Sequence, residues 1–294
     1  MAIFLLAALT MVAFAANSLL NRLALTDSAT DWSAYTFVRI ASGAIMLMAL
    51  LAWRSWRASQ ADQATSAQGL SLRPPGSFVS ALALVAYAAA FSYAYLSLET
   101  GMGALILFSL VQATMIAWGL VSGERPSGLE WTGMVAAFGG FVWLVSPGLS
   151  APDPLGAALM ALAGVAWGVY TLRGKGAADP LGLTAGNFVR AAPLALVPLL
   201  FAAVAGSWNI DGYGVFLGIL SGAITSGLGY ALWYRTLRHF TATQAAILQL
   251  TVPVIAAAMG LLFAGEAPTL RLMAASAIIL GGVAIAILAR RPQT

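Results

Sequence analysis

The stretch SGERPSG at Ser122–Gly128 lies between two long apolar runs and is followed by the pair Gly139-Gly140. A second stretch, AGEAPTL at Ala264–Leu270, is followed by the pair Gly281-Gly282. The Gly, Glu and Pro of the second stretch, and its glycine pair, all follow those of the first by 142 residues. A Gly-Glu-x-Pro stretch and a glycine pair repeated at one fixed offset indicate an internal duplication.

Two further segments recur in the same order. TFVRIA at Thr36–Ala41 matches NFVRAA at Asn187–Ala192, and VAFAANSLLNR at Val12–Arg22 matches VAWGVYTLRGK at Val165–Lys175. The offsets of these two matches are 151 and 153 residues, which unequal loops would produce. Three ordered matches make a chance likeness a poor explanation and support a duplicated unit.

The composition is that of an integral membrane protein. Hydrophobic residues make up 61% of the chain, charged residues only 8%, and the mean hydropathy is +0.88. The absence of cysteine excludes disulfides and thiolate metal sites, and we expect no cofactor and no metal. The net charge of +4 does not indicate nucleic-acid binding, because the basic residues lie singly or in pairs at the ends of apolar runs.

Charges, prolines and glycines divide the chain into ten apolar segments, each close to the about 20 residues that cross a bilayer as a helix. The expected spans are 2–22, 32–53, 77–98, 101–122, 129–146, 154–173, 181–205, 212–234, 241–264 and 268–289. The N-terminal run lacks a basic leader and is long enough to span, so it is interpreted as a retained helix. The predicted fold is an all-α integral membrane protein with repeats of five helices at 1–147 and 151–294.

The basic residues predict the orientation of these spans. Two of the fourteen, Arg39 and Arg190, lie inside spans, and two, Arg22 and Arg271, lie on one side of the membrane. The other side carries ten: Arg54, Arg57, Arg73, Arg125, Arg173, Lys175, Arg235, Arg238, Arg290 and Arg291. Because cytoplasmic loops are enriched in basic residues, both termini are expected in the cytoplasm, in a bacterial-type inner membrane.

An odd number of spans in each repeat forces the second copy to insert upside down. This is the inverted-repeat arrangement of secondary transporters, with the binding site between the two halves. The repeated turn then builds both membrane faces: its Glu stays at the interface, its Pro fits the first turn of the next helix, and the glycines allow close packing. We expect Glu124 and Glu266 to have this structural role and no part in transport.

With these features the chain resembles the drug/metabolite transporter superfamily in its ten-helix, EamA-like form. The resemblance covers the whole chain, including the aromatic residue early in each first helix and the GE-x-P turn before each last helix. It looks closest to the bacterial aromatic amino acid exporters of that group. The resemblance implies efflux of small metabolites by alternating access, through a central cavity lined by the first, third and fourth helices of each half.

Polar and aromatic residues inside those six helices are the candidates for binding substrate. Phe14 and Asn17 share one face of the first span, and Trp167 and Tyr170 share the matching face of the sixth. A mid-membrane amide that faces lipid is costly, which favours inward-facing glutamines. The predicted substrate-binding residues are Phe14, Asn17, Tyr87, Gln112, Trp167, Tyr170, Tyr230 and Gln249. The alternatives for them are lipid-facing packing and hydrogen bonding between helices.

Arg39 and Arg190 are possible ligands for a substrate carboxylate, because a cation inside a span marks a functional site by default. Each lies within about two turns of a span end, so the alternative is a structural side chain that extends to the interface. No Asp or Glu lies at mid-span, which argues against simple carboxylate-based proton antiport. An uncharged aromatic cavity suits a substrate with an apolar or aromatic body.

These residues favour a secondary transporter, acting as a monomer in the lipid bilayer, that exports aromatic and other bulky amino acids. The alternatives are an exporter of phosphorylated metabolites or of drugs and cations from the same superfamily, and more remotely a membrane enzyme. An enzyme would need an acid/base or nucleophile constellation, but the chain has a single histidine, His239, and no catalytic residue is assigned. A channel would need a ring of charges or carbonyls, usually built by an oligomer, and a pseudo-symmetric monomer without a ring of charges argues against this class.

The topology has a direct test. A reporter fused after Thr294 should be cytoplasmic, and one inserted in the loop at Ser207–Gly214 should lie on the opposite side, because ten spans place them across the bilayer from each other. Paired alkaline phosphatase and fluorescent protein fusions measure this. If both positions report the same side, the ten-span arrangement is wrong.

Overall fold

The computed structural model describes residues 2–61, 74–123, 125–148, 151–174, 176–237, 239 and 248–289, and these residues form helices joined by loops, without a strand. The helices are α1 (Ala2–Thr26), α2 (Trp32–Ala61), α3 (Phe78–Ala94), α4 (Thr100–Val121), α5 (Gly128–Val145), α6 (Pro154–Gly174), α7 (Pro180–Val204), α8 (Gly212–Ile219), the π-helix η1 (Leu220–Leu228), α9 (Gly229–Leu237), α11 (Thr251–Phe263) and α12 (Leu270–Leu288). The all-helical prediction is therefore confirmed for the described part of the chain.

The helices are those of a multi-pass membrane protein. Among the described residues, eight segments are long and apolar enough to cross a bilayer, and one of them, Gly212–Trp233, runs through α8, η1 and α9 without interruption. Two further apolar helices, α3 and α11, are shorter. Together they fall on the ten segments expected from the sequence. The start of the expected span 241–264 lies outside the described residues.

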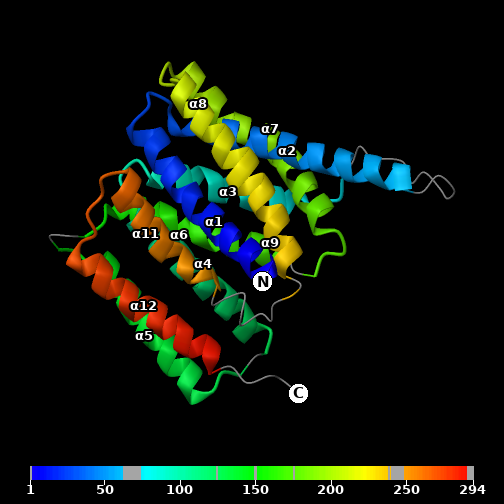
Figure 1. Cartoon of the computed structure of the whole chain (residues 1–294). Helices are drawn as coiled ribbons and strands as arrows, with labels where there is room; N and C mark the ends of the chain where they lie inside the picture. Colours follow the sequence, from blue (N-terminus) through cyan, green and yellow to red (C-terminus); the bar gives the residue numbers. More distant parts are fainter. Residues whose placement is uncertain are drawn as a thin grey trace.

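The helices are arranged around a central group. Helix α3 packs against α6, α4 against α6 and α11, and α1 against α11, η1 and α9. Helices α2 and α7 pack against each other at one edge, and α5 and α12 pack against each other at the opposite edge (Figure 1). The center of the molecule is therefore formed by α1, α3, α4, α6, α11 and the η1–α9 segment.

The glycine of each Gly-Glu-x-Pro stretch ends a helix. Gly123 follows the end of α4 with a φ of 93°, and Gly265 follows the end of α11 with a φ of 64°. Residues with a side chain rarely adopt a positive φ, whereas glycine does so at little cost and is the common residue just beyond a helix C-terminus. The repeated glycine is therefore the signal that reverses the chain at both turns.

The following helix is capped by a hydroxyl in both copies. Ser127 Oγ accepts a hydrogen bond from the Glu130 amide at 3.3 Å, and Glu130 Oε2 accepts one from the Ser127 amide at 2.5 Å. Thr269 Oγ1 accepts from the amide three residues later at 3.1 Å. Pro126 and Pro268 precede these caps, so the expectation that they occupy the first helical turn is wrong. Serine and threonine occupy the N-cap positions because their side-chain oxygens accept hydrogen bonds from the free N–H groups of the first helical turn.

Glu266 joins the last turn of the repeat to the first half of the chain. Its Oε2 accepts from the Thr100 amide at 2.9 Å, and its Oε1 accepts from Thr100 Oγ1 at 3.1 Å and lies 3.3 Å from Arg22 Nε. A carboxylate at a helix start offsets the positive end of the helix dipole, and the side chain of the N-cap residue Glu99 makes no cap bond. Glu266 thus holds α1, α4 and the turn before α12 together. Glu124 lies outside the described residues.

At the end of α2, Arg54 donates to both oxygens of Asp179, at 2.9 and 2.7 Å. This hydrogen bonding lowers the pKa of Asp179, which also accepts from the Gly182 amide at the start of α7. Because the pKa of Asp179 is lower in the folded protein than in the unfolded chain, ionised Asp179 stabilises the fold. This stabilisation is fully present when the pH is above the unfolded pKa of about 3.9, and it is lost as the pH falls through the folded pKa. Because both side chains are partly exposed, the pair contributes little at neutral pH.

Helices α5 and α12 approach backbone to backbone through glycine. A Cβ on Gly133 would lie 2.5 Å from the carbonyl oxygen of Gly282, and a Cβ on Gly282 would lie 2.6 Å from that of Gly133. A Cβ on Gly140 would lie 2.8 Å from the Ile278 side chain. The preceding glycines of the two pairs, Gly139 and Gly281, face open space. Close packing of this kind replaces the hydrophobic driving force that is missing between helices in lipid.

The glycine pair on α12 offers a matched test of this contact. Gly282→Leu should destabilise the protein by about 1–3 kcal/mol, because the added side chain forces α5 and α12 apart. Gly281→Leu should have little effect, since nothing lies within 4 Å of a Cβ at this position. Thermal unfolding of the purified protein in detergent measures both. Equal melting temperatures for the two variants would contradict the packing described here.

Candidate functional site

A buried polar cluster lies where α1, α3 and η1 meet, and Asn17 is its center. Asn17 Nδ2 donates to the Tyr87 hydroxyl at 3.3 Å. Asn17 Oδ1 accepts from Ser221 Oγ at 2.5 Å and from Thr225 Oγ1 at 3.2 Å. All four side chains are buried. Because a bilayer interior supplies no water, these polar groups depend on one another for hydrogen bonds. The structure therefore brings together two predicted residues, Asn17 and Tyr87, and adds two hydroxyls from η1.

Arg39 reaches the same cluster from α2. Its Nη2 donates to the Tyr87 hydroxyl at 2.8 Å, and its Cζ lies 5.1 Å from the ring centroids of both Tyr87 and Phe91. The residue is only 1% exposed, so the alternative that it extends to the interface is wrong. Its other terminal nitrogen, Nη1, has no hydrogen-bond partner, and no carboxylate among the described residues forms an ion pair with it.

Arg190, which occupies the matching place in the second half, is held elsewhere. Its Nη1 donates to the carbonyl oxygen of Pro74 at 3.2 Å and to that of Gly186 at 2.8 Å. These carbonyls belong to the segment before α3 and to α7, whereas Tyr87 lies in the middle of α3. The structure therefore separates the two arginines that the sequence motif places in equivalent positions.

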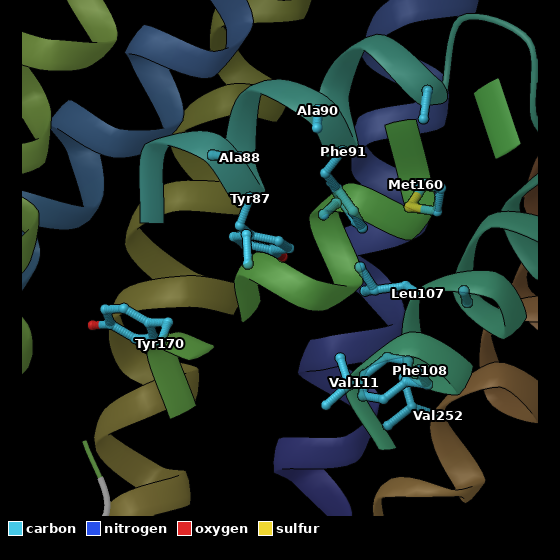
Figure 2. Packing of buried hydrophobic residues seen from close by; sticks show 14 of the residues in the cluster. Tyr87, Ala88, Ala90, Phe91, Leu107, Phe108, Val111, Met160, Tyr170 and Val252 are labelled. Carbon is cyan, nitrogen blue, oxygen red and sulfur yellow. The ribbon is translucent and has the colours of Figure 1, made fainter. Parts of the chain in front are cut away.

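Aromatic rings surround Trp167 next to the polar cluster. The ring centroid of Trp167 lies 4.9 Å from that of Tyr87 and 5.0 Å from that of Tyr230, and its ring stacks on Tyr170 at 5.4 Å and 24°. Phe14 approaches Tyr230 edge-on, with centroids 5.9 Å apart. Figure 2 labels Tyr87, which belongs to α3, and Tyr170, which belongs to α6. Five of the predicted residues thus form one continuous group of rings.

A small pocket opens among these rings. It is lined by Phe14, Trp167, Thr171, Tyr230, Trp233 and Gln249. Its volume of about 10 Å³ holds at most one water molecule. The arrangement is therefore a closed one, in which the rings fill the space that a ligand would need. Rings that meet edge-on or tilted can separate and re-form such contacts at modest cost, about 0.5–1.5 kcal/mol a pair.

Gln112 lies apart from the other predicted residues. It lines a pocket of about 280 Å³ between α4, α5 and α12, whose other lining residues are mostly apolar. This pocket is larger than the one at Trp167 but contains no buried charge and few polar groups. The face of α4 that packs into the center carries Leu107, Phe108 and Val111 instead (Figure 2).

Two features of the site went beyond the sequence reasoning. Trp233 lines the pocket, and its spacing of three residues from Tyr230 was the available signal, since such residues share a helix face. The other feature is the π-helix η1, for which the sequence gives no signal. Its wide turns place Ser221 and Thr225 against Asn17, and Gly222 lets the backbone of α2 pass at the Arg39 carbonyl. Segments of π-helix inside α-helices often lie at functional sites.

Two of the following comparisons with known proteins name a transporter. A family model described as the EamA-like transporter family matches residues 154–288. A Pseudomonas aeruginosa protein described as uncharacterized is 48% identical over 281 residues, which cover 96% of this chain and 93% of that protein. The threonine/homoserine exporter RhtA of Salmonella typhimurium is 30% identical over 212 residues, 68% of each chain. A solved crystal structure superposes over 99% of both chains with a TM-score of 0.65 at 18% identity, which concerns the fold alone.

The hydrogen bonds of Asn17 can be tested through stability. Asn17→Leu should lower the free energy of unfolding by about 1–3 kcal/mol, because it leaves buried hydroxyls without their partner. Thr10→Val is the matched control on the same helix: Thr10 is also buried, but its hydroxyl donates to the Leu6 carbonyl of its own helix. Thermal unfolding in detergent should show a clear loss for Asn17→Leu alone. A variant as stable as the control would show that the cluster contributes nothing to the fold.

Proposed function

The chain belongs to the EamA-like transporter family, and from this we propose that it exports small metabolites, above all aromatic and other bulky amino acids, from the cytoplasm by alternating access. Membership of this family makes the chain a membrane transporter and not an enzyme. The aromatic preference and the direction of transport are the parts that the proposal adds.

The observation that carries the proposal is the group of rings around Trp167. These rings and Gln249 surround a pocket at the meeting point of α1, α6, α9 and the residues before α11. A flat apolar side chain that enters between Trp167 and Tyr230 would exchange ring-ring contacts for equivalent contacts with the ligand. The Gln249 amide offers a donor and an acceptor to the polar groups of that ligand without adding a fixed charge.

The relative named a threonine/homoserine exporter supports amino acids as the class of cargo. The identity of 30% is too low to transfer that relative's substrate. The pocket lining differs from what a small hydroxylated side chain would need, because four of its six residues are aromatic. For this reason we propose a bulkier, more apolar cargo than threonine.

Alternating access requires two halves that can exchange roles, and we propose that the halves 1–147 and 151–294 form an inverted repeat. The helix contacts support this. If α1 to α5 correspond in order to the five spans that begin with α6, the packing of α3 on α6 corresponds to that of α1 on α8, η1 and α9. The pairs α2–α7 and α5–α12 each map onto themselves. Both halves of the proposed pathway lie in one chain, so a monomer is sufficient, with both termini in the cytoplasm.

Uptake into proteoliposomes tests the proposal. Radiolabelled Phe, Tyr and Trp should enter faster than Thr or homoserine, and much faster than Glu. Trp167→Ala should reduce Phe uptake by roughly 2- to 12-fold, because it removes stacking worth about 0.5–1.5 kcal/mol. Gln249→Ala should also reduce it. Trp131→Ala is the control, since Trp131 is 49% exposed on α5, away from the pocket.

The same assay decides between the proposal and its alternatives. Glu transport as fast as Phe transport, or normal Phe uptake by folded Trp167→Ala and Gln249→Ala, would contradict the aromatic assignment. Movement of sugar phosphates or of organic cations without any amino acid would replace it with one of the other cargo classes of the superfamily.

A further inference from the structure

We propose that Arg39 binds the carboxylate of the cargo, so that this transporter requires a carboxylate and rejects amines that lack one. The inference rests on the proposed export of amino acids and names the chemical group that the site recognises. Its basis is the environment of Arg39, which is unusual for a guanidinium inside a membrane protein.

Arg39 is a buried cation whose hydrogen bonding is incomplete. The residue is 1% exposed, its Nη1 has no hydrogen-bond partner, and no ion pair is formed with a carboxylate of the described residues. A charge inside a membrane protein normally pairs with an opposite charge or with backbone carbonyls. A guanidinium presents its N–H groups in a planar fork that matches the two oxygens of a carboxylate. An anionic ligand would supply both the missing charge and the missing acceptor.

The Tyr87 hydroxyl occupies the position that such a ligand would need. It accepts hydrogen bonds from Arg39 Nη2 at 2.8 Å and from Asn17 Nδ2 at 3.3 Å. These two donors converge on one oxygen, as they would on an oxygen of a bound carboxylate. The ring of Tyr87 packs on Trp167, which lines the pocket, so a displacement of Tyr87 would connect Arg39 with the space beside Trp167. In the closed arrangement the phenol is therefore a neutral substitute for the cargo's carboxylate.

The rest of the cluster suits the other groups of an amino acid. Asn17 Oδ1 accepts from Ser221 Oγ and Thr225 Oγ1, and Thr225 Oγ1 also lies 2.9 Å from the Ser221 carbonyl oxygen. If Thr225 donates its single proton to that carbonyl, one lone pair of Asn17 Oδ1 becomes available to an ammonium group near Arg39. The face of Trp167 attracts cations and is the best aromatic ring for this purpose. No carboxylate of the described residues competes for the ammonium there. Because the only full charge in the cluster is positive, the carboxylate is the group on which recognition depends.

The single charge also distinguishes between anions. A phosphate dianion would favour two or more converging cations, and Arg190 is the only other mid-span candidate. Its guanidinium is engaged by the carbonyls of Pro74 and Gly186 and does not reach Tyr87. One arginine with one amide and two hydroxyls matches a carboxylate better than a phosphate monoester.

Ligand binding by the purified full-length protein tests this without any variant. The four probes are phenylalanine, 3-phenylpropionate, phenethylamine and phenyl phosphate. Compared with phenylalanine, 3-phenylpropionate lacks the ammonium group and phenethylamine lacks the carboxylate. Binding is measured as the ligand-dependent rise in melting temperature and as competition with radiolabelled Phe uptake. Phenylalanine and 3-phenylpropionate should bind about 10- to 100-fold more tightly than phenethylamine, as expected for a charge-assisted hydrogen-bonded pair. Equal binding of phenethylamine would overturn the inference, and so would tightest binding of phenyl phosphate.

Variants separate a role in recognition from a role in folding. Arg39→Gln should lose the preference for carboxylates, and Arg39→Lys should keep part of it, because an ammonium retains the charge but not the fork. Arg190→Gln is the matched control and should bind phenylalanine within about twofold of the wild type. Tyr87→Phe keeps the ring on Trp167 and removes the competing hydroxyl, so it should bind phenylalanine more tightly. Unchanged or weaker binding by Tyr87→Phe would contradict its role as a substitute for the carboxylate.

The outcomes distinguish this inference from the function on which it rests. If phenylalanine is transported but phenethylamine competes equally well, the proposed export stands and the role of Arg39 fails. If no amino acid is transported but 3-phenylpropionate raises the melting temperature of the wild type and not of Arg39→Gln, the anion site stands and the proposed cargo fails.

Discussion

The Tyr87 hydroxyl is the point on which the interior of this protein depends. Water is absent from the apolar part of a bilayer, so a polar group at that depth needs a partner from the protein. Tyr87 on α3 provides one acceptor for Arg39 on α2 and for Asn17 on α1, and Asn17 extends the network to η1. Four helical segments are thereby fixed around one oxygen. This network also positions the aromatic rings that pack on Tyr87.

Small residues make that network possible. Apolar side chains gain little by leaving lipid for a helix interface, so helices in a membrane associate through close packing and hydrogen bonds. Gly222 of η1 allows the backbone of α2 to pass at the Arg39 carbonyl, and the Arg39 side chain is buried among these helices. The α5–α12 contact uses the same means at the opposite edge, through Gly133 and Gly282. Glycine thus sets the distances between helices, and polar side chains set which helices meet.

The sequence predicted the helices well because length and hydropathy decide whether a segment spans. It also placed Phe14 with Asn17, and Trp167 with Tyr170, on shared helix faces, since residues three apart share a face, and the structure brings these residues into adjoining clusters. Periodicity does not fix how a helix is rotated about its axis within the bundle. Gln112 was therefore grouped with the cavity, although the structure turns it toward the pocket beside α5 and α12.

Two other differences have physical causes of the same kind. The motif around Arg39 recurs at Arg190, but the neighbours that decide whether each arginine has a partner come from other parts of the chain. The π-helix depends on how η1 packs against α1 and α2, and neither the glycines nor the hydroxyl residues of this segment predict a π-helix. Whatever is set by contacts between distant segments lies beyond a single sequence. The Gly-Glu-x-Pro turns depend on near neighbours and could be found, although their prolines precede the helices and do not begin them.

The contact between Glu266 and Thr100 has a consequence for the order in which the protein is made. The two residues are 166 positions apart, and the first turn of α4 takes its cap from the carboxylate. During synthesis α4 therefore leaves the ribosome and enters the membrane long before its cap exists. Until the segment between α11 and α12 has been translated, the start of α4 must rely on headgroups or water at the membrane surface. The first five helices therefore lack one of their stabilising contacts until nearly the whole chain has been inserted.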